Sequence, residues 1–158
     1  DRELMRARAS LHRKTASCGA GEVVEAVLRV LRRTSPGNEK DWIVDIPPDL
    51  SVAADAGDLT EILGAIAENA ARHAKSRVGI DAQVDGQTVE IRIDDDGPGI
   101  PPDRLAEITR RGVRADEASA GSGFGLAIAS ELAETLGGRL DLHPGSPGLS
   151  VHVILPKG

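Results

Sequence analysis

Hydrophobic and polar residues alternate with two different periods along this chain of 158 residues. A period near 3.6, which is typical of amphipathic helices, runs through residues 22–33 and, most clearly, through residues 58–74. In the second run Asp58 is placed to cap the first turn, with Glu61 three residues later as in a capping box. A weaker apolar stripe over residues 1–14 predicts a short helix outside the main core. The first half of the chain therefore contains three predicted helices.

A period of two, which is typical of half-buried strands, marks two runs at residues 77–84 and 88–95. The Asp85-Gly86 pair between them favours a tight hairpin turn, because glycine readily adopts the positive φ that such turns need. Shorter apolar runs, bounded by prolines and glycines, predict the remaining elements. These are strands at 42–46, 50–54, 139–143 and 149–156 and helices at 102–109 and 124–136.

The order of these elements predicts an α/β (α+β) two-layer sandwich, in which helices pack on one face of a mixed, mainly antiparallel sheet. Residues 110–123 ("RRGVRADEASAGSG") have no apolar period. Segments of this length without a pattern are uncommon inside a compact domain unless they form a functional loop, so we expect a mobile lid there. Residues 15–21 are predicted to form a linker.

The composition narrows the class of protein. Hydrophobic residues make up 40% of the chain, with Trp42 and Phe124 as its only aromatic residues, so the core must be aliphatic. A net charge of −6 argues weakly against non-specific nucleic-acid binding, which needs a basic face. The single Cys18 excludes an intrachain disulfide and fits a reducing compartment. No apolar run is long enough to span a membrane. We therefore expect a cytoplasmic fragment without direct membrane contact, cut from a longer parent protein whose anchorage in the inner membrane stays open.

The stretch "DDDGPGI", Asp94 to Ile100, ends the second hairpin strand in three carboxylates. A metal cage fits poorly, because alternation along a strand sends the middle acid to the opposite face and no matching ligand spacing lies elsewhere. An acidic turn and a nucleotide pocket both remain open. In a pocket, an inward Asp95 would accept a hydrogen bond from an exocyclic amine, and Gly97 and Gly99 would let a planar ring approach the backbone.

Two further stretches offer polar groups next to helices. Asn69 lies on the border of the apolar stripe of residues 58–74, where its amide either bonds a neighbouring backbone group or serves a ligand. "GSGFGLA", residues 121–127, places three alternating glycines before a helix start, which offers bare N–H groups to phosphate. A flexible entry to an ordinary helix is the alternative. The spacing fits neither a dinucleotide-binding fingerprint nor a Walker A loop, but the order of the three motifs along the chain is specific.

On these motifs the chain resembles the ATP-binding domain of the GHKL superfamily, and specifically that of sensor histidine kinases. "EILGAIAENAARHA" resembles the N box, "DDDGPGI" the G1 box, and "GSGFGLAIASELAETLGGRL" the G2 box with the helix and strand that follow it. The resemblance covers residues 20–156. It implies a Bergerat ATP-binding fold with a mobile ATP lid, ATP and Mg²⁺ as ligands, and transfer of the γ-phosphate to a histidine.

The resemblance also implies roles for individual residues. Asn69 matches the amide that binds Mg²⁺ at the ATP phosphates, Arg72 a basic position that contacts phosphate, and His73 the planar residue near adenine. Asp95 matches the carboxylate that receives the adenine amino group, and Arg114 is our choice for the lid residue that reaches the γ-phosphate. Asn69 and Arg114 are thus the expected catalytic residues. The other expected contacts are Gly97, Gly99 and Ile100 in the adenine wall and Gly121, Ser122, Gly123, Phe124, Gly125 and Leu126 at the phosphates.

The sequence departs from the family pattern in three respects. Relatives that hydrolyse ATP carry a Glu one helical turn before the metal-binding Asn, and many histidine kinases have a second Asn there, but this chain has Ala65. Because alanine cannot deprotonate water, transfer to an external nucleophile is favoured over hydrolysis. The aromatic F box is not recognisable. The lid has Ser119 where some relatives have a basic residue, and its charge comes from Arg110, Arg111 and Arg114.

The phosphoacceptor motif of these kinases is missing from the sequence. His12 lacks the acid and the proline that accompany the accepting histidine, and His143 lies in the final strand region. We therefore expect residues 1–15 to be the end of a dimerisation-domain helix and residues 16–158 to be the ATP-binding catalytic domain. The expected partners are a histidine-bearing dimerisation domain, in the same or a sister chain, and a response regulator downstream, with no nucleic acid.

Two other functions stay open at this point. The missing second Asn and the altered lid are compatible with a degenerate GHKL module that binds nucleotide and regulates through protein contacts. The related serine kinases that bind sigma-factor regulators are the other branch, which the helical residues 1–14 disfavour.

Overall fold

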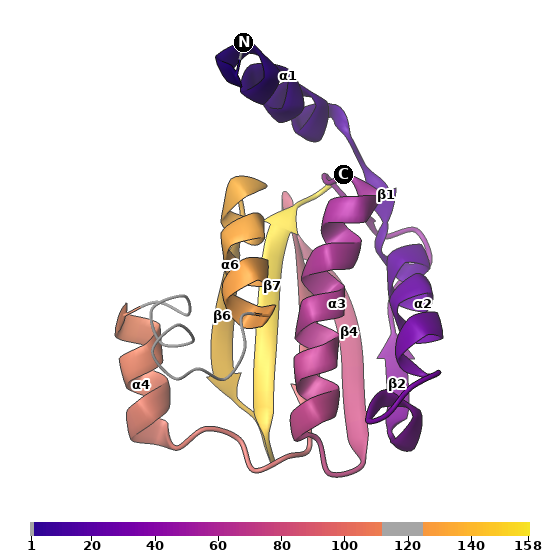
Figure 1. Cartoon of the computed structure of the whole chain (residues 1–158), viewed down its shortest axis with the longest axis vertical. Helices are drawn as coiled ribbons and strands as arrows, with labels where there is room; N and C mark the ends of the chain where they lie inside the picture. Colours follow the sequence, from indigo (N-terminus) through magenta and orange to yellow (C-terminus); the bar gives the residue numbers. More distant parts are fainter. Residues whose placement is uncertain (1, 112–124) are drawn as a thin grey trace.

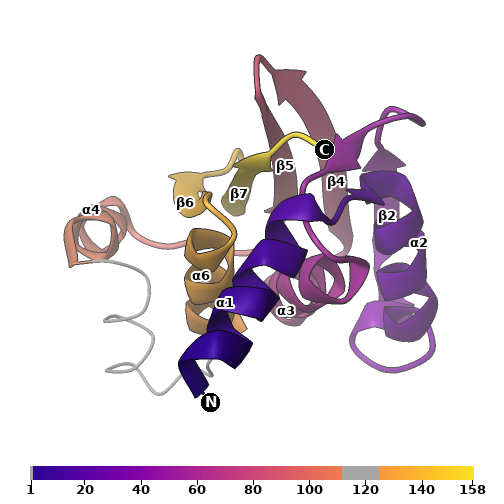
Figure 2. The ribbon, with the colours of Figure 1, turned by 90° about the horizontal axis from the view of Figure 1, so that it is seen from above.

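The computed structural model describes residues 2–111 and 125–158. Five strands form one sheet in the order β2-β4-β5-β7-β6, and α2, α3 and α6 lie together on one of its faces (Figures 1 and 2). The predicted two-layer sandwich is confirmed. The helices are α1 (Arg2–Thr15), α2 (Ala20–Leu31), the 3-10 helix η1 (Gly37–Glu39), α3 (Ala56–His73), α4 (Pro102–Arg111) and α6 (Gly125–Thr135), and the strands are β1 (Cys18–Gly19), β2 (Asp41–Asp45), β3 (Ser51–Val52), β4 (Arg77–Asp85), β5 (Thr88–Asp95), β6 (Arg139–Pro144) and β7 (Leu149–Pro156).

The sheet is mixed and mainly antiparallel, as the element order predicts. β4 and β5 form the predicted hairpin around Gly86, whose φ of 62° is the positive value that such a turn needs. β5 pairs antiparallel with β7, and β7 pairs antiparallel with β6. The edge strand β2 is parallel to β4, because α3 lies between them in the sequence and returns the chain to the same end of the sheet.

Helix α3 begins earlier than its apolar period predicts. Asp55 caps it: the backbone of this residue is extended, and its carboxylate accepts a hydrogen bond from the N–H of Gly57 at 2.7 Å. The prediction of Asp58 as the cap is therefore wrong, because Ala56 and Gly57 contribute nothing to the apolar period although both are helical. Asp58 lies in the first turn, where its charge is favoured by the positive end of the helix dipole.

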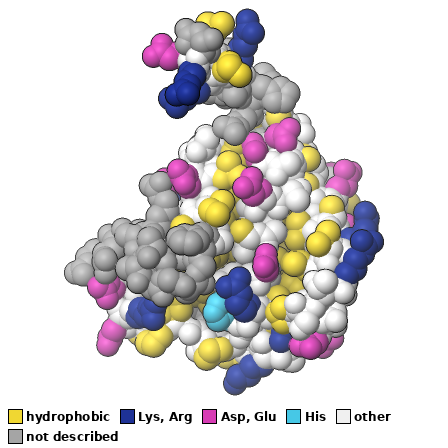
Figure 3. All heavy atoms as spheres, in the orientation of Figure 1, with side chains coloured by type: hydrophobic (Ala, Val, Ile, Leu, Met, Phe, Trp, Pro, Cys, Tyr) yellow, Lys and Arg dark blue, Asp and Glu magenta, His cyan; other side chains and the backbone are white. Residues whose placement is uncertain are grey.

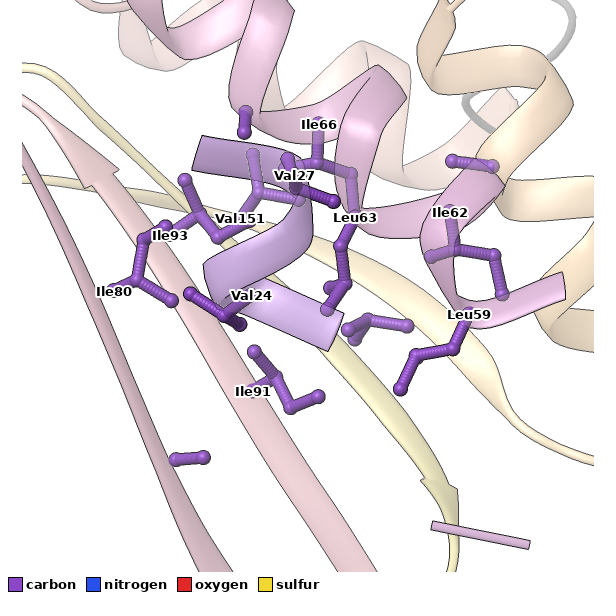
Figure 4. Close-up of a cluster of buried hydrophobic side chains, with 14 of the residues drawn as sticks. Val24, Val27, Leu59, Ile62, Leu63, Ile66, Ile80, Ile91, Ile93 and Val151 are labelled. Carbon is purple, nitrogen blue, oxygen red and sulfur yellow. The ribbon is translucent and has the colours of Figure 1, made fainter. Parts of the chain in front are cut away.

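The core between the helices and the sheet is aliphatic, as the composition predicts. Figure 4 shows side chains of α2 and α3 packed against inward-facing residues of β4, β5 and β7. Every second residue of β5 is buried, namely Val89, Ile91, Ile93 and Asp95, which is the period that predicts the strand. Trp42 is half-buried at the edge of this core, and its indole N–H donates to the carbonyl O of Gly37 at 2.9 Å. The sheet and helices that position the site therefore form one apolar unit.

Helix α1 stands apart from the body of the molecule (Figure 1), and Leu4 and Met5 on it are exposed. The segment that follows is more ordered than the predicted linker, since β1 pairs with β3 and α2 begins at Ala20. Val52 of β3 also bridges to Lys157 near the end of the chain. A strand of two residues has no apolar period, so its pairing has no signal in the sequence.

Helix α4 confirms the predicted helix at 102–109 and extends it to Arg111. Most of the predicted lid, residues 112–123, lies outside the described residues. Within residues 2–111 and 125–158, no helix combines the length and apolar character that crossing a membrane requires.

Candidate functional site

The N and G1 boxes meet where α3 and β5 end. Gly97 is buried, and a Cβ added to it would collide with the backbone carbonyl O of His73. Gly99 has a φ of 71°, and a Cβ added to it would lie 2.7 Å from the carbonyl O of Gly148 in the β6–β7 turn. Both glycines are therefore required by the close packing of one backbone on another. Their predicted contact with a planar ring stays a prediction.

Asp95 is the buried acid of the three, with 5% of its surface exposed. The backbone N–H of Gly97 donates to its Oδ1 at 2.9 Å, and the backbone N–H of Leu149 is a second donor. Burial raises the pKa of the Asp95 carboxyl above its usual range, although these hydrogen bonds and the charge of His73 act in the opposite direction. Because a carboxylate has about four acceptor positions, Asp95 retains capacity for a further donor.

The two neighbouring acids face other parts of the chain. Asp94 pairs with Gly79 and Ser150 in the sheet and lines with them a hollow of about 370 Å³. Asp96 accepts hydrogen bonds from the segment between α3 and β4. Among the described residues, no group of three or more His, Cys, Asp or Glu side chains could hold a metal ion.

Asn69, Arg72 and His73 lie on the last turns of α3. Asn69 is half-buried, and within the described part of the chain nothing hydrogen-bonds its side-chain amide. The alternative in which a neighbouring backbone group satisfies this amide is thus not what the structure shows. His73 Nδ1 lies 2.9 Å from the carbonyl O of Asn69 and must donate to it, because a carbonyl only accepts. In the neutral ring, Nε2 is then the acceptor. His73 and Arg72 are both exposed, and Figure 3 shows a histidine beside a basic side chain on this face.

The amide of Asn69 fits one kind of metal site. An amide oxygen without a hydrogen bond is a hard donor of the type that Mg²⁺ accepts. Mg²⁺ usually retains several waters and takes only one or two protein ligands together with substrate phosphates. A single amide next to a nucleotide therefore suits Mg²⁺, whereas it could not form a cage made of protein alone.

The G2 box meets the N box one helical turn before Asn69. Gly125 begins α6, and a Cβ added to it would lie 3.6 Å from the carbonyl O of Ala65 and 3.8 Å from its Cβ. Leu126 and Ala129 are buried in the main core, which fixes α6 against α3. Ala65 therefore lies at the junction of the two boxes. The other predicted residues of the lid and the G2 box, Arg114, Gly121, Ser122, Gly123 and Phe124, lie outside the described residues.

Other parts of this site have no signal in the sequence pattern. Gly148, with a φ of 92°, packs so closely on Asp95 that an added Cβ would collide with the Asp95 carbonyl O and lie 2.8 Å from its Oδ1. Lys40 donates from Nζ to the carbonyl O of Ala74 at 2.9 Å, just after α3. The turn "SPGLSV" marks Gly148 as a turn residue, but a turn signal does not show which strand end it meets.

Comparisons with known proteins agree with this geometry. A family model described as histidine kinase-, DNA gyrase B-, and HSP90-like ATPase matches residues 54–158. The sensor protein kinase CarS of Pseudomonas aeruginosa is 45% identical over 112 residues, which cover 70% of this chain and 25% of CarS. The two-component sensor PhoQ of the same organism is 42% identical over 98 residues, which cover 62% of this chain and 22% of PhoQ. The chain thus spans about a quarter of the length of these curated relatives.

Solved structures show the same fold. The mycobacterial sensor histidine kinase MprB superposes with a TM-score of 0.73 at 27% identity, over 90% of this chain and 97% of that one. The catalytic domain of the histidine kinase ThkA gives a TM-score of 0.76 over 90% and 95%, and at 19% identity it shows the fold alone. The matched residues include all three boxes that meet around α3. This chain belongs to the family of histidine kinase-, DNA gyrase B- and HSP90-like ATPases, as an ATP-binding domain of the sensor histidine kinase type.

Proposed function

We propose that this chain is the catalytic domain of a two-component sensor histidine kinase, which transfers the γ-phosphate of MgATP to a histidine on a dimerisation domain. The observation that carries this proposal is the meeting of three distant segments, represented by Asn69, Gly97 and Gly125, around the C-terminal half of α3. The full-length structure of ShkA, which is 27% identical with a TM-score of 0.72 over 90% of this chain and 31% of ShkA, was solved in complex with AMPPNP. This supports a nucleotide as the ligand.

Adenine recognition is assigned to Asp95. Its buried carboxylate, held by the N–H groups of Gly97 and Leu149, would accept a hydrogen bond from the exocyclic amino group of adenine. Guanine has a carbonyl oxygen at the corresponding ring position, which would set one acceptor against another, so the site should discriminate against GTP. His73 is assigned a place beside the adenine ring, and Gly97, Gly99 and Ile100 are assigned to the wall of the adenine pocket.

Phosphate binding is assigned to α3 and the G2 box. Asn69 would hold Mg²⁺ together with phosphate oxygens, and Arg72, on the same helix, would contact phosphate. Bound Mg²⁺ supplies neutralisation of the charge on the β- and γ-phosphates. The backbone N–H groups of Gly121, Gly123 and Gly125 and the side chain of Arg114 are proposed to hold the terminal phosphates.

The proposed transfer needs positioning more than covalent chemistry from this chain. An imidazole nitrogen forms a bond to the γ-phosphorus while the bond to the β–γ bridging oxygen breaks, and ADP leaves with that electron pair. Free imidazole is largely unprotonated at neutral pH, so the nucleophile needs no base. Water does need one, and Ala65 at the junction of the N and G2 boxes cannot act as a base. Hydrolysis should therefore be slow.

The division of the chain and its partners are also proposals. Residues 1–15 are assigned to the end of a dimerisation-domain helix and residues 16–158 to the catalytic domain. The separate position of α1 and the exposure of Leu4 and Met5 support this, since exposed apolar side chains on a lone helix suit packing against other helices (Figure 1). The partners would be the histidine-bearing domain and a response regulator.

A second function is favoured by one observation. Position 65, where many histidine kinases have a second Asn, is Ala in this chain. Asn69 is then the one amide in this part of α3 that the family pattern assigns to the metal. A regulatory module that binds nucleotide without transferring phosphate would tolerate this loss.

The test joins this chain to a helical hairpin that carries the accepting histidine and follows acid-labile phosphate after incubation with MgATP. We expect labelling of the wild type and a loss of at least about 100-fold for Asn69→Ala, above the 10–100-fold typical of residues that only support a metal ligand. Glu68→Ala, one residue away and exposed, is the matched control. Equal labelling of Asn69→Ala and wild type would remove Asn69 from the mechanism. Nucleotide binding without any labelling would favour the regulatory module.

A further inference from the structure

One carboxylate binds the segment that links the end of α3 to the start of β4. Asp96 Oδ1 accepts hydrogen bonds from the backbone N–H groups of Lys75 at 2.8 Å, Ser76 at 3.0 Å and Arg77 at 3.1 Å. Its Oδ2 accepts a fourth from the Ser76 hydroxyl at 2.8 Å. These hydrogen bonds hold the pKa of the Asp96 carboxyl well below its usual range, so the group stays ionised at any pH at which a kinase works.

A cation holds the same segment through its carbonyl groups. Lys40 donates from Nζ to the carbonyl O of Ala74 at 2.9 Å and reaches that of Lys75 at 3.4 Å. Ala74 is the C-cap of α3, so its carbonyl lies at the negative end of the helix dipole, where an ammonium group is favoured. The backbone adds two links, from Asp41 N–H to Ser76 O and from Asp96 N–H to Arg77 O. Residues 74–77 are thus bound on their amide side by an anion and on their carbonyl side by a cation.

This double clamp joins the two halves of the proposed nucleotide site. Asp96 directly follows Asp95, which is assigned to adenine, and the clamped segment directly follows the helical turns that bear Asn69 and His73. Gly97, the next residue, packs on the carbonyl O of His73. A movement of the end of α3 against the end of β5 would therefore disturb the contacts of Asp96, while Lys40 ties the same segment to the start of β2.

We propose that Asp96 and Lys40 are positioning residues, which touch no nucleotide but fix the separation between the adenine carboxylate and the helix that carries the metal-binding amide. The proposal rests on the proposed function, because it assigns Asp95 and Asn69 to the two ends of one ligand. It predicts that loss of the clamp lowers the affinity most for a ligand that spans both ends, and little for a ligand that engages the adenine side alone.

The experiment measures two affinities of this chain by calorimetry: for Mg·AMPPNP, which spans both ends, and for ADP in the presence of EDTA, which lacks the metal. We expect Asp96→Ala to weaken the first about tenfold and the second less than about threefold. Asp94→Ala is the matched control, since Asp94 is the adjacent acid and takes no part in the clamp. Lys40→Met should give a smaller loss with the same selectivity, with Lys75→Met as its control, because the Lys75 side chain is exposed.

A purely structural role would give a different pattern. It would weaken both ligands alike, and the effect of Asp96→Ala would persist in an Asn69→Ala background. Positioning through α3 predicts instead that the two changes are strongly non-additive for Mg·AMPPNP. Asp96→Asn, which retains an acceptor oxygen for the backbone N–H groups, should restore most of the affinity and also serves if the alanine variant fails to fold.

The possible outcomes separate the clamp from the proposed function. Equal losses for Asp96→Ala and Asp94→Ala, or full additivity with Asn69→Ala, overturn the clamp while leaving the kinase assignment intact. Failure of the wild type to bind Mg·AMPPNP overturns the proposed function itself, whereas an Asn69→Ala variant that binds as well as wild type removes Asn69 from the site and overturns the clamp with it. Faster amide exchange at residues 69–77 in Asp96→Ala, without a change elsewhere, supports the clamp independently of any ligand.

Discussion

The two ends of α3 are anchored very differently. At the N-terminal end, the carboxylate of Asp55 caps the helix by accepting a hydrogen bond from the N–H of Gly57. At the C-terminal end, Asp96 accepts four hydrogen bonds from residues 75–77, and Lys40 donates to two carbonyls. A single cap is enough to start a helix, so the extra contacts at the other end are not needed for helix formation. They lie where the helix carries the proposed nucleotide-binding residues.

The largest effect on stability is expected at the C-terminal end. Gly97→Ala should lower the free energy of unfolding by about 2–4 kcal/mol, because the added methyl group collides with the backbone carbonyl O of His73 and one backbone must shift. Urea unfolding measures this. Gly64→Ala is the control: it lies mid-helix in α3 with no atom within 4 Å of the added Cβ, and it should stabilise the protein by about 0.5–1 kcal/mol. If the two variants were equally stable, the close contact between the G1 and N boxes would not matter.

A smaller effect is expected at the N-terminal end. Asp55→Ala should cost about 1 kcal/mol through loss of the cap, while the affinity for Mg·AMPPNP stays at the wild-type value. Parallel unfolding and binding measurements check both statements. A loss of nucleotide affinity would mean that the two ends of α3 are coupled, and the contrast between them would then fail.

The smallest effect on stability has the opposite sign. Burial raises the pKa of Asp95 in the folded chain above the usual 3.8. Between pH 3.8 and the raised pKa, the folded state therefore binds more protons than the unfolded one. Stability then falls as the pH rises through that window. Asp95→Asn removes this loss and should raise the melting temperature at pH 7 by about 2 °C, while adenine affinity falls. At a pH below 3.8 the difference in melting temperature should vanish. An unchanged ADP affinity in this variant would remove Asp95 from the site.

Periodic elements were predictable from the sequence, whereas the strand β1 and the pairing of the very short strands were not; the strand predicted at 50–54 is present as β3. The β4–β5 hairpin matches its prediction to within a residue at its first strand and fully at its second, because alternation and the Asp-Gly turn act locally. The start of α3 was predicted wrongly, since Asp55 and Asp58 are both good caps and only the backbone conformation separates them. β1 and β3 consist of two residues each and exist through long-range pairing.

The residues of the site also differ in whether a local sequence pattern predicts their position. Asp95 was predicted as inward by alternation along β5, and it is buried. Asp96 was predicted only as an acid of the turn, because the N–H groups that it binds come from a segment about twenty residues earlier. Lys40 and Gly148 have no local pattern that links them to the site, and their contacts arise from the packing of η1 and the β6–β7 turn.

The scarcity of aromatic residues has a practical consequence. The chain has one tryptophan and no tyrosine. This residue, Trp42, lies two positions after Lys40, and its indole N–H donates to the carbonyl O of Gly37. Its emission is therefore an intrinsic optical reporter of the strand that starts beside the C-terminal end of α3. A spectral shift on loosening that corner would be visible without attaching any dye to the protein.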